Sequence, residues 1–160
     1  MFNHRPTEAQ TLLLRAALCQ DDRALAIWRV WRFAADLDQL PAGGFPLLPL
    51  VAYNLQRHAF VDPVLDKCQG IHRRTWTQNQ MLVQSLLPLL HALHQTGITP
   101  ILQGDLALAL FHYPEQGLRM INTVDLLTPP VQANAVPPLL TQSGWQPKPA
   151  KHHWLRTLLV

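Results

Sequence analysis

The sequence is poor in charged residues and in β-branched residues. Charged side chains make up 14% of its 160 residues, against about 25% in an average soluble domain. Valine and isoleucine together number 14, whereas leucine alone numbers 30. Disordered chains combine high charge with low hydrophobicity, so the 48% of hydrophobic residues argues against disorder. Leucine loses little rotamer freedom in a helix, and the composition therefore predicts a mostly helical protein rather than an all-β one.

Cysteines and long apolar runs are also scarce. Cys19 and Cys68 lie far apart and form no metal-ligand or redox motif, so we expect buried thiols in a reducing compartment. The first ten residues lack the apolar stretch of a signal peptide. Residues 75–104 contain no Asp, Glu, Lys or Arg, but amide and hydroxyl side chains interrupt them before about 18 apolar residues accumulate. We expect a cytoplasmic protein with no membrane span.

The net charge of +3 arises after Asp125, where Lys148, Lys151 and Arg156 occur without an acid, but these basic residues are not adjacent to one another. Nucleic-acid-binding proteins normally gather basic residues on one face, whereas in this sequence only two basic residues, Arg73 and Arg74, are adjacent. This distribution disfavours DNA or RNA binding. A lower-ranked alternative is a nucleic-acid-binding helical module in which Arg29 and Arg32 converge with Arg73 and Arg74 on one face.

Helix signals run through the first 96 residues. Four helices are expected there: one after a capping box at Thr7–Gln10, one after Asp21–Asp22, and two over about residues 48–59 and 63–95. Residues 39–46 form a loop, because their glycines and prolines suit neither helix nor strand. Pro88 predicts a kink or a break in the last of these helices.

The pattern changes at Gly97. The expected elements are strands at 98–103, 120–127 and 154–160, a helix at 105–113 capped by Asp105, and a helix from Thr128 that Pro137–Pro138 split. The fold class is therefore α+β and mostly helical. We divide the chain into a helical region, residues 1–96, and a small α/β core, residues 97–160, packed as one unit.

Motifs for several common chemistries are absent: the sequence has no GxSxG, P-loop or GxGxxG. Four pairs of polar residues are candidate sites by their spacing: Asp21–Asp22, Asp36/Asp38, His91/His94 and His152–His153. The carboxylate pairs fall at helix starts or exposed ends, which favours solvated caps. The first histidine pair shares a helix face without a carboxylate or cysteine to complete a metal site, and the second would diverge on a strand.

The two central predicted strands carry a more specific pattern. The first ends at Gly104 as a helix begins, and a helix N-terminus offers free N–H groups to phosphate. The second carries Asp125 in its C-terminal half. This arrangement resembles nucleotidyltransferases of the polymerase-β type, in which a glycine-containing turn holds the triphosphate and an Asp-x-Asp pair binds the metal ions. Side chains at i and i+2 of a strand point the same way, so both carboxylates reach one metal pair.

Over most of its length the chain resembles a bacterial family of uncharacterised nucleotidyltransferases. The segments that carry the resemblance are LLLRAAL, FPLLPLVAYNL, GIHRRTWTQNQMLV, GITPILQGDLALALFHY, GLRMINTVDLLTPP and LLTQSGW. Each is weak alone, but their order and spacing are specific. The resemblance implies a nucleotidyltransferase fold with phosphate-binding residues at Gln103, Gly104, Asp105 and Arg119, and Asp125 as a catalytic metal ligand if the protein is active.

The sequence departs from the family pattern at positions that matter. Gln103 stands where the family has lysine, which removes a positive charge from the phosphate turn. Thr123 stands where the family has the first aspartate, and Asn122 points to the opposite face. The family's third acid, expected near His152–Trp154, has no counterpart, because no acid follows Asp125.

These departures predict a nucleotidyltransferase-family protein with a degraded active site that acts as a binding or scaffold subunit. Its expected partner is another protein or a second copy, with weak nucleotide binding and no required cofactor. The alternative is an active enzyme that uses Mg²⁺ and a nucleoside triphosphate to transfer a nucleotidyl group to a small molecule or protein.

Overall fold

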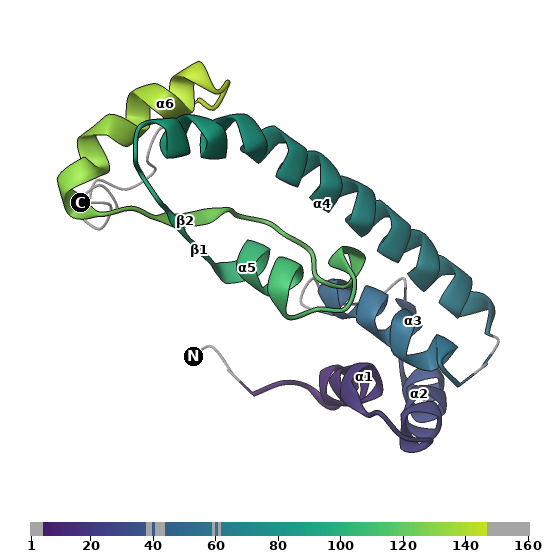
Figure 1. The fold of residues 1–160 in the computed structure, drawn as a ribbon. Helices are drawn as coiled ribbons and strands as arrows, with labels where there is room; N and C mark the ends of the chain where they lie inside the picture. The colour runs from purple at the N-terminus through teal and green to yellow at the C-terminus, as the bar shows by residue number, and fades with distance from the viewer. Residues whose placement is uncertain (1–4, 38–39, 41–43, 59, 61, 147–160) are drawn as a thin grey trace.

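A computed structural model describes residues 5–146, except 38–39, 41–43, 59 and 61. Its elements are α1 (Glu8–Leu18), α2 (Arg23–Ala34), η2 (Phe45–Leu47), α3 (Leu48–Gln56), α4 (Pro63–Gln95), β1 (Ile101–Gln103), α5 (Gly104–Phe111), η3 (Gln116–Leu118), β2 (Asp125–Leu127), η4 (Pro130–Ala135) and α6 (Val136–Gln142). The α elements are α-helices, the η elements are 3₁₀-helices, and β1 and β2 are strands (Figure 1). The predicted mostly helical α+β class is confirmed.

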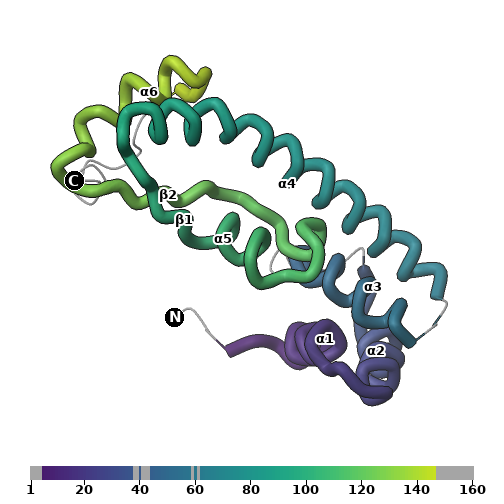
Figure 2. The backbone as a smooth tube through the Cα atoms, viewed as in Figure 1, coloured from purple at the N-terminus to yellow at the C-terminus, as the bar shows by residue number. Residues whose placement is uncertain are grey.

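The long helix α4 extends from the N-terminal helices to α6, and α3, η3 and α6 pack against it (Figure 2). Its 33 residues span about 50 Å at 1.5 Å per residue. Asp62 caps its N-terminus by accepting a 2.8 Å hydrogen bond from Val64 N. The helix continues through Pro88, so the predicted break does not occur there. Pro88 lies on the exposed face, and the buried neighbours Leu86 and Leu89 hold the helix on both sides of it.

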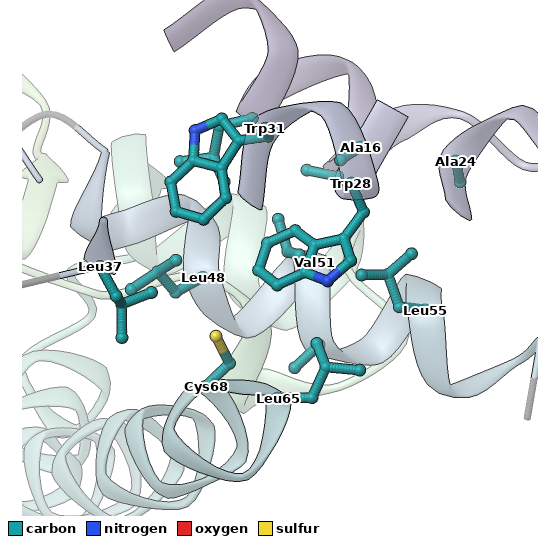
Figure 3. Close-up of a cluster of buried hydrophobic side chains, with 13 residues drawn as sticks. Ala16, Ala24, Trp28, Trp31, Leu37, Leu48, Val51, Leu55, Leu65 and Cys68 are labelled. Atoms are coloured by element: carbon teal, nitrogen blue, oxygen red, sulfur yellow. The ribbon is translucent and has the colours of Figure 1, made fainter. Parts of the chain in front are cut away.

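The N-terminal helices build one hydrophobic cluster with the start of α4 (Figure 3). At its centre the rings of Trp28 and Trp31 stack with centroids 5.0 Å apart, and both side chains are fully buried. Leu65 and Cys68 of α4 close the cluster from below in this view. The predicted capping box at Thr7 is present.

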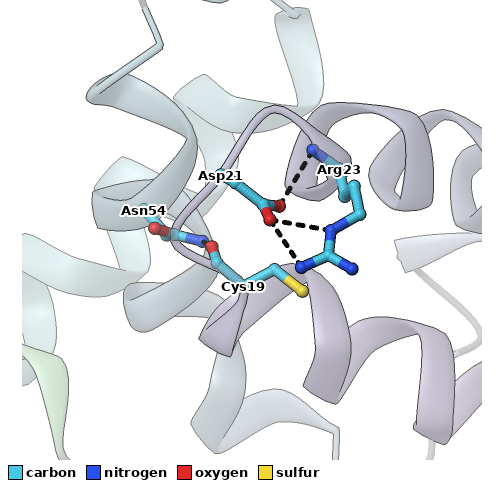
Figure 4. A network of polar contacts seen from close by, with 4 residues as sticks. All are labelled: Cys19, Asp21, Arg23 and Asn54. Atoms are coloured by element: carbon cyan, nitrogen blue, oxygen red, sulfur yellow. Dashed lines mark hydrogen bonds and ion pairs between the residues drawn. The ribbon is translucent and has the colours of Figure 1, made fainter.

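The α1–α2 connection is held by a polar network (Figure 4). Asp22 occupies the N-cap position of α2 without a side-chain cap, and Asp21 instead accepts a 3.1 Å bond from Arg23 N. The Asp21 carboxylate also pairs with the Arg23 guanidinium at 2.6 Å. Buried Asn54 of α3 donates to the carbonyl oxygens of Ala16 and Cys19, which anchors the end of α1.

A second hydrophobic cluster forms at the other end of α4. Leu86, Leu89 and Leu93 pack there against Leu106 of α5 and, more peripherally, against residues of the strands and α6. The chain leaves α4 through Gly97, whose φ of +73° reverses the backbone. Ile98 N bonds to Leu93 O at 2.9 Å, which closes the helix end and returns the chain to this cluster.

β1 and β2 form an antiparallel pair of three residues each, in the register Ile101↔Leu127, Leu102↔Leu126 and Gln103↔Asp125. β1 begins just after Pro100, which is one of the two placements that the proline allows. The predicted strand 120–127 was too long, because only Asp125–Leu127 has a partner: β1 ends where Gly104 starts a helix, so residues 120–124 have no strand beside them.

Two further predictions are settled near the C-terminal part of the described chain. Asp105 does not cap α5, since Gln103 is the N-cap residue and the Asp105 carboxylate pairs with Arg119 instead. Pro137–Pro138 do separate two helices, because they fall in the first turn of α6, where their missing N–H groups cost nothing. The predicted strand 154–160, the His152–His153 pair and Asp38 lie outside the described residues.

No helix in the described ranges combines the length and the apolar character needed to cross a membrane.

Candidate functional site

The turn between β1 and α5 lies directly against the carboxylate of Asp125. Gly104 has a φ of +64°, and a Cβ atom placed on it would lie 2.5 Å from Asp125 Oδ2. Glycine is therefore required at this position by both its backbone conformation and the available space. The fold thus brings together the glycine turn and the aspartate that the sequence singled out.

This contact places a negative charge beside the first residue of α5. The N-terminus of a helix carries partial positive charge and stabilises a nearby anion. Here the chain supplies that anion itself, through Asp125. A nucleotide phosphate that approaches Gly104 therefore meets a carboxylate, and the repulsion is relieved only if a cation lies between them.

The neighbours of Asp125 on the exposed face of the strand pair are uncharged. Gln103 lies directly opposite Asp125 in the register, where Cβ atoms are about 4.5–5.5 Å apart. Thr123 is exposed like Asp125, whereas Val124 between them is partly buried against the second cluster. Thr123 lies two residues before Asp125, in the segment that leads into β2. Neither a lysine nor a second carboxylate is present at these two positions.

The other acid of the predicted phosphate turn is already paired. Asp105 Oδ1 accepts from Arg119 Nη2 at 2.6 Å, and both side chains are partly buried. The Arg119 guanidinium also lies 5.9 Å from the ring centroid of Tyr113. Partial burial lowers the pKa of Arg119, but its contacts with Asp105 and Tyr113 outweigh that effect and leave the pKa above its ordinary value. The two predicted phosphate-site residues thus neutralise each other.

Asn79 is a site residue that the sequence interpretation missed. It is buried in α4 and donates to the carbonyl oxygens of Gln116 and Arg119, and its Oδ1 accepts from Ile121 N at 3.2 Å. It thereby fixes the backbone on both sides of Arg119 and the approach to Asp125. The available signal was an amide on the buried stripe of a helix, a position that normally carries a hydrocarbon side chain.

The donor set does not fit a pair of magnesium ions. Mg²⁺ is usually bound by one or two carboxylates together with phosphate oxygens and water, and a two-metal centre must hold both ions. Asp125 is the carboxylate that remains available, because Thr123 is neutral and Asp105 is paired with Arg119. Within the described ranges, no three His, Cys, Asp or Glu side chains gather where a metal could bind. His91 and His94 are both exposed on α4.

A cavity of about 140 Å³ lies beside the Asp105–Arg119 pair, and Tyr113, Met120 and Asn122 are among the residues that line it. Asp125 and Gly104 do not line it. This cavity therefore adjoins the ion pair rather than the remaining carboxylate.

A comparison with known protein families identifies the family of this chain. A family model described as an uncharacterised nucleotidyltransferase matches residues 46–157, which is more than half of the chain. The chain belongs to this family. The nucleotidyltransferase match begins in η2 and includes α3, α4, both strands and every predicted site residue, whereas α1 and α2 lie before it. No curated protein and no solved structure matches the chain.

Proposed function

We propose that this nucleotidyltransferase-family protein has lost metal-dependent catalysis and acts as a binding subunit. The observation that carries the proposal is the environment of Asp125. Thr123, two residues earlier, and Gln103, directly opposite in the register, stand in place of a carboxylate and a cation, and the nearby Asp105 is held by Arg119 at 2.6 Å. A single free carboxylate does not supply the charge that two metal ions and a triphosphate require.

Exposed apolar residues around the strand pair support the binding part of the proposal. Ile101 and Leu127 face each other across the strands and are 62% and 50% exposed. Phe111, at the end of α5, is 70% exposed. Exposed apolar surface typically marks an interaction site when it is contiguous, and the opposed Ile101 and Leu127 belong to the same strand pair as Asp125. The proposed partner is a protein that covers this surface.

The second candidate is an active nucleotidyltransferase. The close contact between Gly104 and Asp125 favours it, because the glycine turn and one carboxylate keep their juxtaposition. Such an enzyme would have to obtain further metal ligands from a partner chain.

Pyrophosphate release from ATP, GTP, CTP and UTP, measured with Mg²⁺ or Mn²⁺, distinguishes the two candidates. The proposal predicts no release above background from the wild-type chain, and the same result for Asp125→Asn. Metal-dependent release that Asp125→Asn abolishes would establish the enzyme instead. Release that survives Asp125→Asn would come from a contaminant or from different chemistry. A second variant, Thr123→Asp, adds the missing carboxylate two residues before Asp125. It should create measurable Mg²⁺ affinity if the other residues around Asp125 can still hold the ion.

A further inference from the structure

The two hydrophobic clusters are separated along the middle of α4. Leu65 and Cys68 belong to the first cluster, and the second begins at Leu86. Within the described part of α4 between these positions, the buried residues are Thr75 and Asn79, both polar. Ile71 packs against the first cluster and Leu82 against the second, so the apolar core is interrupted over about three turns of the helix.

A cavity of about 620 Å³ occupies this interval. Its walls combine apolar and polar side chains: Ile71, Leu82 and Met120 among the former, and Arg74, Gln78 and Asn122 among the latter. One wall is α4, and the opposite wall is the segment that leads from Arg119 toward β2. Sites for small organic molecules typically measure 300–1,000 Å³ and are mostly apolar with a few polar groups. This cavity has that size and that composition.

The charge of the cavity is set by Arg74. No acidic residue is among the residues that line it, and in the part of the chain that the structure describes Arg74 forms no ion pair. Arg119, on the adjoining segment, is already neutralised by Asp105. A guanidinium binds carboxylate, sulfonate and phosphate groups through charge-assisted hydrogen bonds, and the amides of Gln78 and Asn122 can donate further bonds.

We propose that this cavity is a binding site for a small organic anion that has an apolar body and one anionic group. Arg74 binds the anionic group, and Ile71, Leu82 and Met120 cover the apolar body. The site is separate from the Gly104–Asp125 turn, so the proposal does not depend on whether that turn is active.

A matched pair of fluorescent probes tests both halves of the proposal. 8-Anilinonaphthalene-1-sulfonate carries an aromatic body and one sulfonate, and N-phenyl-1-naphthylamine has the same body without the charge. We expect one high-affinity sulfonate-probe site per chain. Arg74→Gln should weaken the sulfonate probe about tenfold, the loss of one charge-assisted contact, and change the neutral probe less than twofold. Arg73→Gln, the adjacent arginine outside the cavity, is the control and should leave both probes unchanged.

A filling variant locates the site. Gln78→Trp should remove both probes from the cavity while circular dichroism and the urea midpoint stay close to those of the wild type. Equal effects of Arg74→Gln and Arg73→Gln on the sulfonate probe would overturn the proposal. So would probe binding unchanged in a folded Gln78→Trp variant, because the probes would then occupy exposed apolar surface elsewhere. If Gln78→Trp does not fold, the comparison of the two arginine variants decides alone.

Discussion

Asn79 lies on the buried stripe of α4 and makes three hydrogen bonds to the backbone between Gln116 and Ile121. A buried amide of this kind stabilises only while its partners are satisfied. Its removal leaves two carbonyl oxygens and one N–H without a partner in a place that water reaches poorly. The segment that carries Arg119 is therefore sensitive to the loss of this one side chain.

Asn79→Ala should lower the free energy of unfolding by about 3 kcal/mol, since each unsatisfied buried polar group costs about 1–3 kcal/mol. Urea unfolding followed by circular dichroism measures the change. The control is Gln78→Ala, one residue earlier and exposed, which should stay within about 0.5 kcal/mol of the wild type. A loss below about 1 kcal/mol for Asn79→Ala would show that the three bonds contribute little.

The two cysteines are expected to differ in reactivity. Burial raises the pKa of the Cys68 thiol to about 11, and the nearby Asp62 carboxylate adds to the effect. Only the thiolate reacts with disulfide reagents, and at pH 8 about one Cys68 thiol in a thousand is ionised. Cys19 is only half-buried. With 5,5′-dithiobis(2-nitrobenzoate), Cys19 should react first and Cys68 only as fast as the protein unfolds. Rapid modification of Cys68 in the folded protein would contradict its burial.

The same raised pKa gives a pH dependence of stability. The folded state favours the neutral thiol, so this contribution is complete below the unfolded pKa of about 8.5 and is lost as the pH rises toward 11. The free energy of unfolding of the wild type should therefore fall more steeply between pH 8.5 and 11 than that of Cys68→Ala. Parallel pH profiles for the two proteins would refute the assignment.

At the scale of elements, the β1–α5 turn is constrained both by its backbone conformation and by the space around Gly104. Gly104→Ala forces a residue with a side chain to adopt a positive φ, which costs about 1–2 kcal/mol. It also places a Cβ atom against the Asp125 carboxylate. Gly144 has a φ of +84°, and among the described residues none beyond its chain neighbours comes within 4 Å of a Cβ atom added there, so Gly144→Ala reports mainly the backbone cost. Urea unfolding should show a clearly larger loss for Gly104→Ala than for Gly144→Ala.

The excess loss at Gly104 should depend on Asp125. In the Asp125→Ala background the carboxylate is gone, and Gly104→Ala should then cost about as much as Gly144→Ala, about 1–2 kcal/mol. If the cost of Gly104→Ala were the same with and without Asp125, the two residues would not be in contact.

The helices were largely predictable from the sequence, and the strands were predictable only in part. Caps and apolar periodicity are local signals, and they placed the first four helices correctly in type and approximately in extent. The strand predicted over 120–127 was too long because a strand needs a partner, and the length of β1 is set by Pro100 and Gly104 rather than by residues 120–124. The β-branched residues at 121, 123 and 124 favour a strand but do not show where the partner strand ends.

Within the candidate site, the contact between Gly104 and Asp125 agrees with the sequence pattern, whereas the pairing of Asp105 was not predicted. The shared face of Thr123 and Asp125 stays a prediction. The carboxylate of Asp105 was expected to cap α5, and it instead reaches Arg119, 14 residues later in the chain. A contact between distant residues depends on how Asn79 positions the η3 segment, which no local pattern encodes. The size of the cavity beside Arg74 was unpredictable for the same reason.

At the scale of the whole molecule, α4 connects two hydrophobic clusters that share no buried residue. The first cluster is built mainly by α1, α2 and α3, and the second by α5, the strands and α6 (Figure 1). The family match spans α4 and reaches both clusters. The turn between Gly104 and Asp125 lies beside the second cluster, and the proposed anion site lies in the interval between the two.

The central claim is that the Asp125 face no longer couples nucleotide binding to a metal ion. Calorimetric titration of the wild-type chain with ATP, GTP and CTP, each with and without Mg²⁺, tests it most directly. A helix N-terminus stabilises an exposed anion by only about 0.3–1 kcal/mol, and Asp125 opposes the phosphate. The account predicts affinities no tighter than millimolar that change less than twofold with Mg²⁺. Micromolar binding that requires Mg²⁺ and is lost in Asp125→Asn would contradict it and establish Asp125 as a working metal ligand.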